Sequence, residues 1–286
     1  MATADDTHSM ALFCDFENVA LGVRDAKYDK FDIRKVLERL LVKGSIVVKK
    51  AYCDWERYKE FKGAMHEAAF ELIEIPHVRM SGKNSADIRM VVDALDLCYT
   101  KSHVDTFVII SGDSDFSPLV SKLRENNKAV IGVGVKKSSS DLLISNCDEF
   151  IYYDDLVREE KAKVKRAPSP RKKPARKAAS TAKATPPEQE EKPEYEDKTA
   201  QALDLVMSTV DALLAERGDD EKIWGSMIKQ TLKRRHPGFN ESYYGFKSFN
   251  SLLEEAALRG LLDLKRDEKS GGYIVRAGSN EPLLAE

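Results

Sequence analysis

The chain has 286 residues and is poor in both cysteine and histidine. Its four cysteines, Cys14, Cys53, Cys98 and Cys147, stand singly in apolar stretches, without C-x-x-C spacing or paired histidines nearby. This pattern argues against a disulfide framework and against a Cys/His zinc site. We therefore expect four buried, reduced thiols.

Long hydrophobic runs are also missing. No apolar segment approaches the roughly 20 residues needed to span a bilayer, and the stretch Met1–Asp6 is too polar for a signal peptide. These features predict a cytoplasmic protein without a membrane partner.

An excess of one charge is absent overall, since the net charge is -2, but charge is unevenly distributed. Ten basic residues and no acid lie between Lys161 and Pro187, and six of the ten prolines lie between Pro168 and Pro193. Such a segment cannot bury enough apolar surface to offset its ordering entropy. We expect a disordered basic linker over 158–197, between a first domain at 1–157 and a second at 198–278, with a tail at 279–286.

Six short apolar runs alternate with helical patterns in the first domain. This alternation predicts an α/β fold, in which a parallel sheet is covered by helices on both faces. The runs are Ala11–Cys14, Ile46–Cys53, Glu71–Ile75, Phe107–Ile110, Val130–Val135 and Phe150–Tyr153. Helices are expected over Phe31–Lys43, Trp55–Phe70, Ser85–Tyr99, Ser117–Asn126 and Asp141–Asn146.

The second domain shows three helical stretches followed by two short strand patterns. This order is typical of a winged helix-turn-helix and suggests a nucleic-acid partner, although Glu254 and Glu255 on the third helix argue against insertion into a DNA major groove. The helices are expected over Lys198–Glu216, Ile223–Arg235 and Ser248–Arg259, and the strands over Leu261–Arg266 and Tyr273–Arg276.

Carboxylates follow the apolar runs at two places and open a helix at a third. Asp15 and Asp113 come directly after probable buried strands, and Asp87 lies in the first turn of the expected Ser85 helix. In an open parallel sheet, ligands bind beyond the carboxyl ends of the strands, so these acids can converge. Convergent carboxylates indicate a hard divalent cation and phosphate chemistry.

Each acid also has an ordinary structural interpretation. An Asp at a strand end commonly makes a turn or caps the next helix, which applies equally to Asp54 and Asp115. Three independent ends that carry acids favour a metal site, because clustered like charges cost stability unless a cation neutralises them. Asn18 and Lys83 lie near these acids in sequence. Lys136 either contacts phosphates beside them or belongs to a solvated loop, and Glu17 and Asp25 are interpreted as acids of surface loops.

Three ordered blocks resemble the NYN family, in its LabA-like branch of the PIN-fold nucleases. They are Leu12-Phe-Cys-Asp-Phe-Glu-Asn18, Lys83-Asn-Ser-Ala-Asp-Ile-Arg-Met90 and Ile110-Ser-Gly-Asp-Ser-Asp-Phe116. The resemblance implies a PIN-like fold and RNA hydrolysis that depends on Mg²⁺ or Mn²⁺. Carried over residue by residue, it assigns metal binding and catalysis to Asp15, Asp87, Asp113 and Asp115, with Asn18 and Asp54 as further contributors.

The second domain resembles an OST-HTH, or LOTUS, domain. The resemblance rests on Ile223-Trp-Gly-Ser-Met-Ile-Lys229 and on Phe239-Asn-Glu-Ser-Tyr-Tyr-Gly-Phe-Lys-Ser-Phe249. It implies a module that binds RNA or a protein partner, with Lys247 as a candidate RNA contact. Two functions remain open: a metal-dependent endoribonuclease, and a non-catalytic RNA-binding adaptor that keeps a vestigial metal site. Cleavage of DNA is a weaker third alternative.

Overall fold

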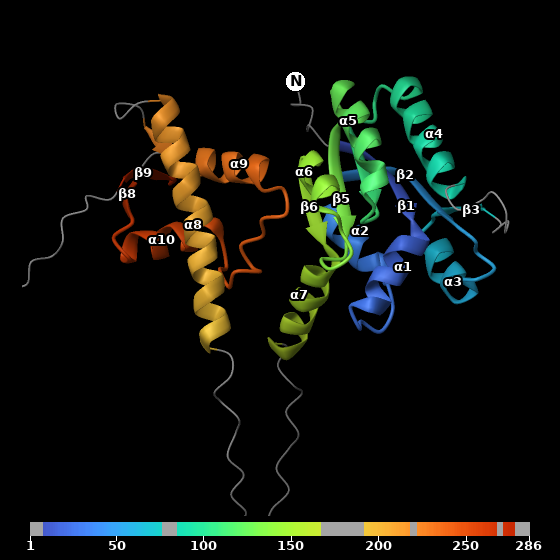
Figure 1. The fold of residues 1–286 in the computed structure, drawn as a ribbon, viewed down its shortest axis with the longest axis horizontal. Helices are drawn as coiled ribbons and strands as arrows, with labels where there is room; N and C mark the ends of the chain where they lie inside the picture. Colours follow the sequence, from blue (N-terminus) through green and yellow to red (C-terminus); the bar gives the residue numbers. More distant parts are fainter. Residues whose placement is uncertain (1–7, 76–84, 167–191, 218–221, 268–270, 278–286) are drawn as a thin grey trace, which may run out of the picture. The chain divides into compact units, whose positions relative to one another are not determined.

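A computed structural model describes residues 8–75, 85–166, 192–217, 222–267 and 271–277 (Figure 1). The chain divides into two units, the first built mainly from residues up to Arg158 and the second mainly from the residues after it. The two units are described separately below.

Six parallel strands form the sheet of the first unit. Their order is β3-β2-β1-β4-β5-β6, and all five neighbouring pairs run parallel. This arrangement confirms the α/β prediction, and each strand lies within a few residues of its expected position. The strands are β1 (His8–Asp15), β2 (Gly44–Cys53), β3 (Glu71–Glu74), β4 (Thr106–Ile110), β5 (Ala129–Gly134) and β6 (Glu149–Tyr152).

Helices cover both faces of this sheet. One of them, α1 (Phe16–Asp25), was not expected, so the interpretation of Glu17 and Asp25 as loop acids is wrong. The chain passes from β1 into α1 without a turn, because Asp15 caps the helix directly. The others are α2 (Ile33–Leu41), α3 (Lys59–Glu67), α4 (Ser85–Thr100), the 3₁₀ helix η1 (Ser114–Phe116), α5 (Ser117–Glu125), α6 (Asp141–Asn146) and α7 (Tyr153–Arg166).

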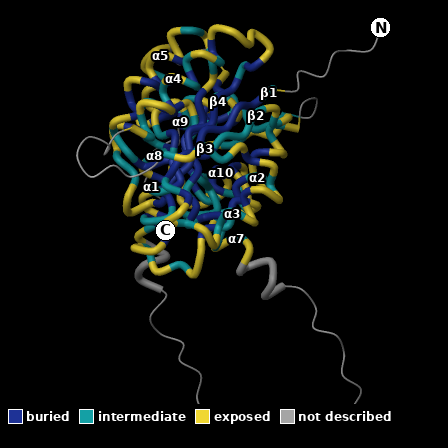
Figure 2. Tube along the Cα trace, turned by 90° about the vertical axis from the view of Figure 1, so that its right-hand side faces the viewer, coloured by how far each residue is buried: buried dark blue, intermediate teal, exposed yellow. Residues whose placement is uncertain are grey.

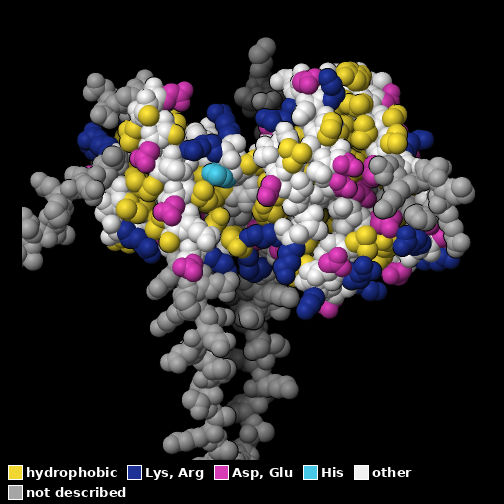
Figure 3. All heavy atoms as spheres, in the orientation of Figure 1, with side chains coloured by type: hydrophobic (Ala, Val, Ile, Leu, Met, Phe, Trp, Pro, Cys, Tyr) yellow, Lys and Arg dark blue, Asp and Glu magenta, His cyan; other side chains and the backbone are white. Residues whose placement is uncertain are grey.

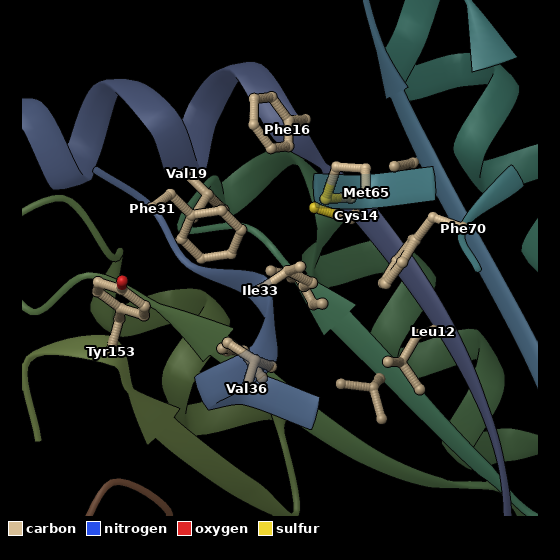
Figure 4. Close-up of a cluster of buried hydrophobic side chains, with 14 of the residues drawn as sticks. Leu12, Cys14, Phe16, Val19, Phe31, Ile33, Val36, Met65, Phe70 and Tyr153 are labelled. Atoms are coloured by element: carbon tan, nitrogen blue, oxygen red, sulfur yellow. The ribbon is translucent and has the colours of Figure 1, made fainter. Parts of the chain in front are cut away.

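Alternating side chains of β1 feed two separate cores. Leu12 and Cys14 pack with Val36 of α2 and Val19 of α1, as Figure 4 shows, whereas Phe13 points into a second core with α4, α5 and α6. This two-sided burial follows from the period of two along a strand. It leaves β1 and β4 almost fully buried, dark blue in Figure 2, so polar groups at their ends are held on a rigid support.

Two further sequence predictions concern the thiols and the membrane. All four cysteines are buried and free, as expected. None of the helices within the described ranges is long and apolar enough to cross a membrane.

The second unit is a small helical domain with a three-stranded antiparallel sheet in the order β7-β9-β8, consistent with a winged helix-turn-helix. The strand β7 corrects the expected helix Ile223–Arg235, because Ile223 and Trp224 pair with β9 before the helix begins. The elements are α8 (Lys192–Arg217), β7 (Ile223–Trp224), α9 (Gly225–Arg235), α10 (Phe249–Leu258), β8 (Leu262–Arg266) and β9 (Tyr273–Ala277).

Helices reach into both ends of the segment expected to be a linker. Helix α7 extends to Arg166 and α8 begins at Lys192. The centre of the expected linker, 167–191, and the expected tail at 279–286 lie outside the described residues.

Candidate acidic site

The candidate site lies at the point in the sheet where the direction of the strand order reverses, between β1 and β4. Strands β1 and β4 are neighbours, but the chain continues from β1 towards β2 on one side and from β4 towards β5 on the other. At such a switch point the connections leave in opposite directions and open a crevice beyond the strand ends. Asp15 ends β1, and Ser111, Gly112 and Asp113 follow β4, so both motifs reach this crevice.

Asp15 is the most buried acid of the site, with 8% of its surface exposed. One carboxylate oxygen accepts a hydrogen bond from the amide of Asn18 at 3.3 Å, and the other accepts one from the Ser111 hydroxyl at 3.0 Å. Burial and the nearby charges of Asp87 and Asp113 raise the pKa of Asp15 to about 7, against the lowering effect of both hydrogen bonds.

Asp87, on helix α4, is the second acid of the candidate site. It is half-buried in the first turn of α4, and burial, followed by the charges of Asp113, Asp115 and Glu17, raises its pKa. The acids whose charges raise the pKa of Asp15 or Asp87 therefore belong to α1, to α4, to η1 and to the residue that caps η1, Asp113. The capping interpretation also holds, because Asp113 accepts a hydrogen bond from the amide of Asp115 at 3.0 Å.

One polar contact connects the segment after β4 to α1, and a second holds that segment in shape. The amide of Gly112 donates to the Asn18 side-chain oxygen at 2.9 Å, and the amide of Asp113 donates to the Ser111 hydroxyl at 3.2 Å. Because Ser111 also donates to Asp15, the two strand-end motifs are held in one hydrogen-bonded unit. Asn18 therefore has a positioning contact in addition to the substrate contact that the sequence suggested.

Gly112 permits a close approach of the loop that follows β5. A Cβ atom at this position would lie 2.5 Å from the carbonyl oxygen of Ser138, and the amide of Ser140 donates to the Gly112 carbonyl at 2.9 Å. We expect Gly112→Ala to lower the free energy of unfolding by about 1–3 kcal/mol through overpacking. Urea denaturation of the full chain measures this loss.

A matched control is Gly63→Ala in α3, where an added Cβ meets nothing within 4 Å. Because alanine is the better helix former by roughly 1 kcal/mol, this variant should be neutral or slightly stabilised. Equal stability of the two variants would show that the loop at Ser138 yields to a side chain at Gly112.

Asp54 and Lys136 make contacts outside the hydrogen-bonded unit formed by Asp15, Asn18 and Ser111. Asp54 follows β2 and accepts a hydrogen bond from the amide of Glu56 at 3.1 Å; its charge raises the pKa of Cys53 but is not among the main influences on Asp15 or Asp87. The Lys136 ammonium lies 5.8 Å from the centre of the Tyr152 ring.

Two lysines complete the set of residues that the sequence suggested. Lys247 is exposed directly before α10, in the second unit, and Lys83 lies outside the described residues.

Sequence reasoning missed two side chains of the site. Ser111 is fully buried against Asp15, and Glu17 raises the pKa of Asp87 while pairing with Arg57 at 3.1 Å. Both lie inside the motifs that were identified, Asp15-Phe-Glu17 and Ser111-Gly-Asp113. Glu17 was missed because helix α1, which begins at Phe16, was not predicted from the sequence.

The carboxylate oxygens of this site suit a hard divalent cation chemically, but they are not arranged as a complete set of metal ligands. Carboxylate oxygens are the ligands that Mg²⁺ and Mn²⁺ prefer, and Mg²⁺ usually keeps several waters. Within the parts of the chain that the structure describes, no group of three or more His, Cys, Asp or Glu side chains is arranged to hold a metal ion. Asp87 and Asp113 thus lie close enough to Asp15 to raise its pKa, but the described acids do not form a ready-made cation site.

Two relatives share sequence with the chain, and neither has an assigned function. An uncharacterized protein of Methanocaldococcus jannaschii is 26% identical over 159 residues, which cover 56% of this chain and 61% of that protein. A crystal structure of a protein of unknown function from Vibrio parahaemolyticus is 27% identical with a TM-score of 0.48, covering 54% of this chain and 98% of that one.

Family models account for both units. The NYN domain model matches residues 9–154, which is just over half of the chain, and the OST-HTH/LOTUS domain model matches residues 196–274. The LabA-like branch stays a prediction. All of the candidate acids lie inside the first match. The chain therefore belongs to the NYN domain family and carries an OST-HTH/LOTUS domain after its NYN domain.

Proposed function

We propose that this protein is a metal-dependent endoribonuclease and that the acid cluster at the sheet switch point is its catalytic site. The observation that carries the proposal is that acids from separate elements lie close together: the charges of Asp87 and Asp113 raise the pKa of Asp15, and the charge of Asp113 raises the pKa of Asp87, at the crevice where open parallel sheets bind ligands. Membership of the NYN family supports it, because NYN domains belong to the PIN-like nuclease superfamily.

We divide the residues of the proposed site into metal ligands and residues that hold those ligands in position. Asp15, Asp87 and Asp113 are the ligands we assign to one or two Mg²⁺ or Mn²⁺ ions, with Asp115 and Asp54 as outer contributors. When bound, such ions activate water and neutralise charge on the scissile phosphate. Ser111 and Asn18 hold the backbone after β4 against Asp15, which fixes the spacing between the carboxylates of the two strands.

RNA is the substrate that both domains suggest. We assign RNA binding outside the acid cluster to the LOTUS domain, where Lys247 is exposed, and to Lys83, Lys136 and Asn18 of the NYN domain. Electrostatic contacts of this kind weaken as salt rises. The LOTUS domain is also the part of the chain to which we assign any protein partner.

A second candidate function is a non-catalytic RNA-binding adaptor. The observation that favours it is the lack, in the described residues, of a group of side chains already arranged around a cation. A capture-and-chase experiment separates the two candidates. Radiolabelled single-stranded RNA is bound to the full chain in EDTA, unbound RNA is removed, and excess Mn²⁺ is then added. The nuclease predicts loss of the bound RNA, whereas bound RNA that stays intact supports the adaptor.

A further inference from the structure

A pocket of about 350 Å³ in the first unit lies between the second half of α1, the segment that leads into α2 and the start of α3. This volume is at the lower end of the range for small-molecule sites, roughly 300–1,000 Å³. Figure 3 shows apolar side chains over α1, with basic and acidic side chains around them. Asp15, Asp87 and Asp113 are not among the described residues that line the pocket, so it is separate from the acid cluster.

Aromatic side chains form part of the wall of this pocket. Phe31 is buried, whereas Tyr58 and Phe61 are partly buried. The ring centres of Tyr58 and Phe61 lie 5.6 Å and 5.1 Å from that of Phe16, and both rings meet it edge to face. Because Phe16 is fully buried, it holds these two rings in place while part of each stays accessible. Fixed aromatic surfaces of this kind bind other planar rings, including nucleobases, by stacking.

Basic side chains line the same pocket. They are Arg24, Lys30 and Arg57, and all three are exposed. The Lys30 ammonium lies 5.9 Å from the centre of the Phe61 ring. Burial raises the pKa of Tyr58, and the charges of Arg57 and Arg24 act against this rise, so both guanidinium groups lie near the Tyr58 side chain. The pocket therefore places positive charge beside an aromatic surface, which suits a ligand that combines a flat ring with an anionic group.

The two arginines are available to such a ligand because their present ion pairs are exposed. Arg57 pairs with Glu17 at 3.1 Å, with 52% and 34% of the two side chains exposed. Arg24 pairs with Asp25 at 3.6 Å, with 73% and 71% exposed. Surface ion pairs of this kind contribute little to stability. A phosphate group, which arginine binds through two parallel hydrogen bonds, can therefore replace the carboxylate partner.

Two acids, Asp29 and Glu60, also line the pocket and limit what it can hold. They repel a ligand that is anionic over its whole surface, but their oxygens accept hydrogen bonds from ribose hydroxyls and base amino groups. The ligand that fits therefore has a flat ring, hydroxyl or amino groups, and negative charge concentrated at one end. An acidic peptide fits less well, because its carboxylates are spread along a chain.

We propose that this pocket binds one nucleoside monophosphate. The base packs against Tyr58 and Phe61, and the phosphate lies among Arg24, Lys30 and Arg57. A free mononucleotide and the phosphorylated terminal nucleotide of an RNA both present this group. Binding here needs neither a metal ion nor cleavage by the acid cluster, so the site stands apart from the proposed nuclease.

The test measures the binding of adenosine monophosphate (AMP) to the full chain by isothermal titration calorimetry in EDTA, so that no divalent cation carries the nucleotide to the acid cluster. Ribose 5-phosphate should bind about tenfold more weakly than AMP, because it has no base to stack. The double variant Lys30→Gln/Arg57→Gln should lower AMP affinity by about tenfold or more, because hydrogen bonds to charged groups have roughly this effect. Both positions are exposed, so the variant should fold normally.

The matched control is Arg124→Gln on α5, a helix that packs into the other core of the sheet. Arg124 pairs with Asp148 at 3.1 Å in an ion pair that is similarly exposed, so this variant should bind AMP like the wild type. A lack of AMP binding at millimolar concentration, or equal binding by the double variant, overturns the proposal. Tighter binding of an acidic peptide that contains phenylalanine overturns it as well and indicates a protein partner.

Short RNAs that differ only in a 5′-phosphate or a 5′-hydroxyl distinguish the two sources of the ligand. If the 5′-phosphate tightens RNA binding in EDTA and AMP abolishes that advantage, the pocket holds the end of an RNA chain. If the phosphate makes no difference while AMP binds, the ligand is a free nucleotide. AMP binding by a protein that does not cleave RNA would leave this site standing without the nuclease, and cleavage without AMP binding would do the reverse.

Discussion

Asp87→Asn is expected to lower single-turnover cleavage of RNA by about a thousandfold while RNA binding stays unchanged. The carboxylate of Asp87 lies among the charges of Asp113, Asp115 and Glu17, and an amide there removes one negative charge from the cation site. Metal ions supply several kcal/mol of transition-state stabilisation, and every 1.4 kcal/mol is a factor of ten in rate. RNA affinity should survive because we assign RNA binding mainly to the LOTUS domain, which contributes no residue to the acid cluster. Quenched-flow cleavage and filter binding on the same protein preparation measure the two effects.

The control for this variant lies on the same helix. Asp96 is exposed on α4 and lies about half a turn away from Asp87 around the helix axis, so Asp96→Asn makes the same chemical change away from the cluster. It should cleave RNA at the wild-type rate. Cleavage by Asp87→Asn within a few-fold of wild type would remove this residue from the catalytic site.

Asp15→Asn is expected to be more stable than the wild type at pH 8, and the difference should shrink as the pH falls. Asp15 has a pKa of about 7 in the folded chain against an ordinary value of 3.8, so the folded state binds its proton more tightly. The stability that this proton contributes is fully present below about pH 4 and is lost as the pH rises through 7. A shift of this size corresponds to a few kcal/mol, since one pKa unit is about 1.4 kcal/mol.

Urea denaturation at several pH values in EDTA measures this difference, and other titrating groups cancel because both proteins contain them. Adding Mn²⁺ at pH 8 should stabilise the wild type more than Asp15→Asn, because the ion replaces the missing proton. A stability difference that does not depend on pH would mean that the Asp15 carboxyl titrates normally and bears no extra charge cost.

The strands and their terminal acids could be predicted from the sequence because both depend on local patterns. Continuous apolar runs such as Phe107–Ile110 mark buried parallel strands, and the acids come directly after them. Helix α1 could not be found in this way. Its first turn, Phe16-Glu17-Asn18, also reads as a loop, and Asp15 both ends the strand and caps the helix. Strand β7 was missed because two residues carry too little pattern and need their partner β9.

The position of the site was predictable, but its contacts were not. Placing acids beyond β1 and β4 needs only the alternation of strands and helices. That Ser111 donates to Asp15 depends on the packing of two segments that are 96 residues apart in the sequence. A groove lined by residues of α4, α5 and α6 likewise requires these helices to lie side by side, which no single stretch of sequence records.

Metal-dependent cleavage of RNA by wild-type protein and by Asp113→Asn, prepared in parallel, tests the central claim most directly. The substrate is single-stranded RNA in which the 2′-hydroxyl at each mapped cleavage position is replaced by hydrogen, so that attack by the RNA's own 2′-oxygen is blocked. The wild type should still cleave it in Mn²⁺ and not in EDTA, and Asp113→Asn should leave it intact. Cleavage that is equal in both proteins, or that persists in EDTA, would contradict a catalytic metal site at these acids.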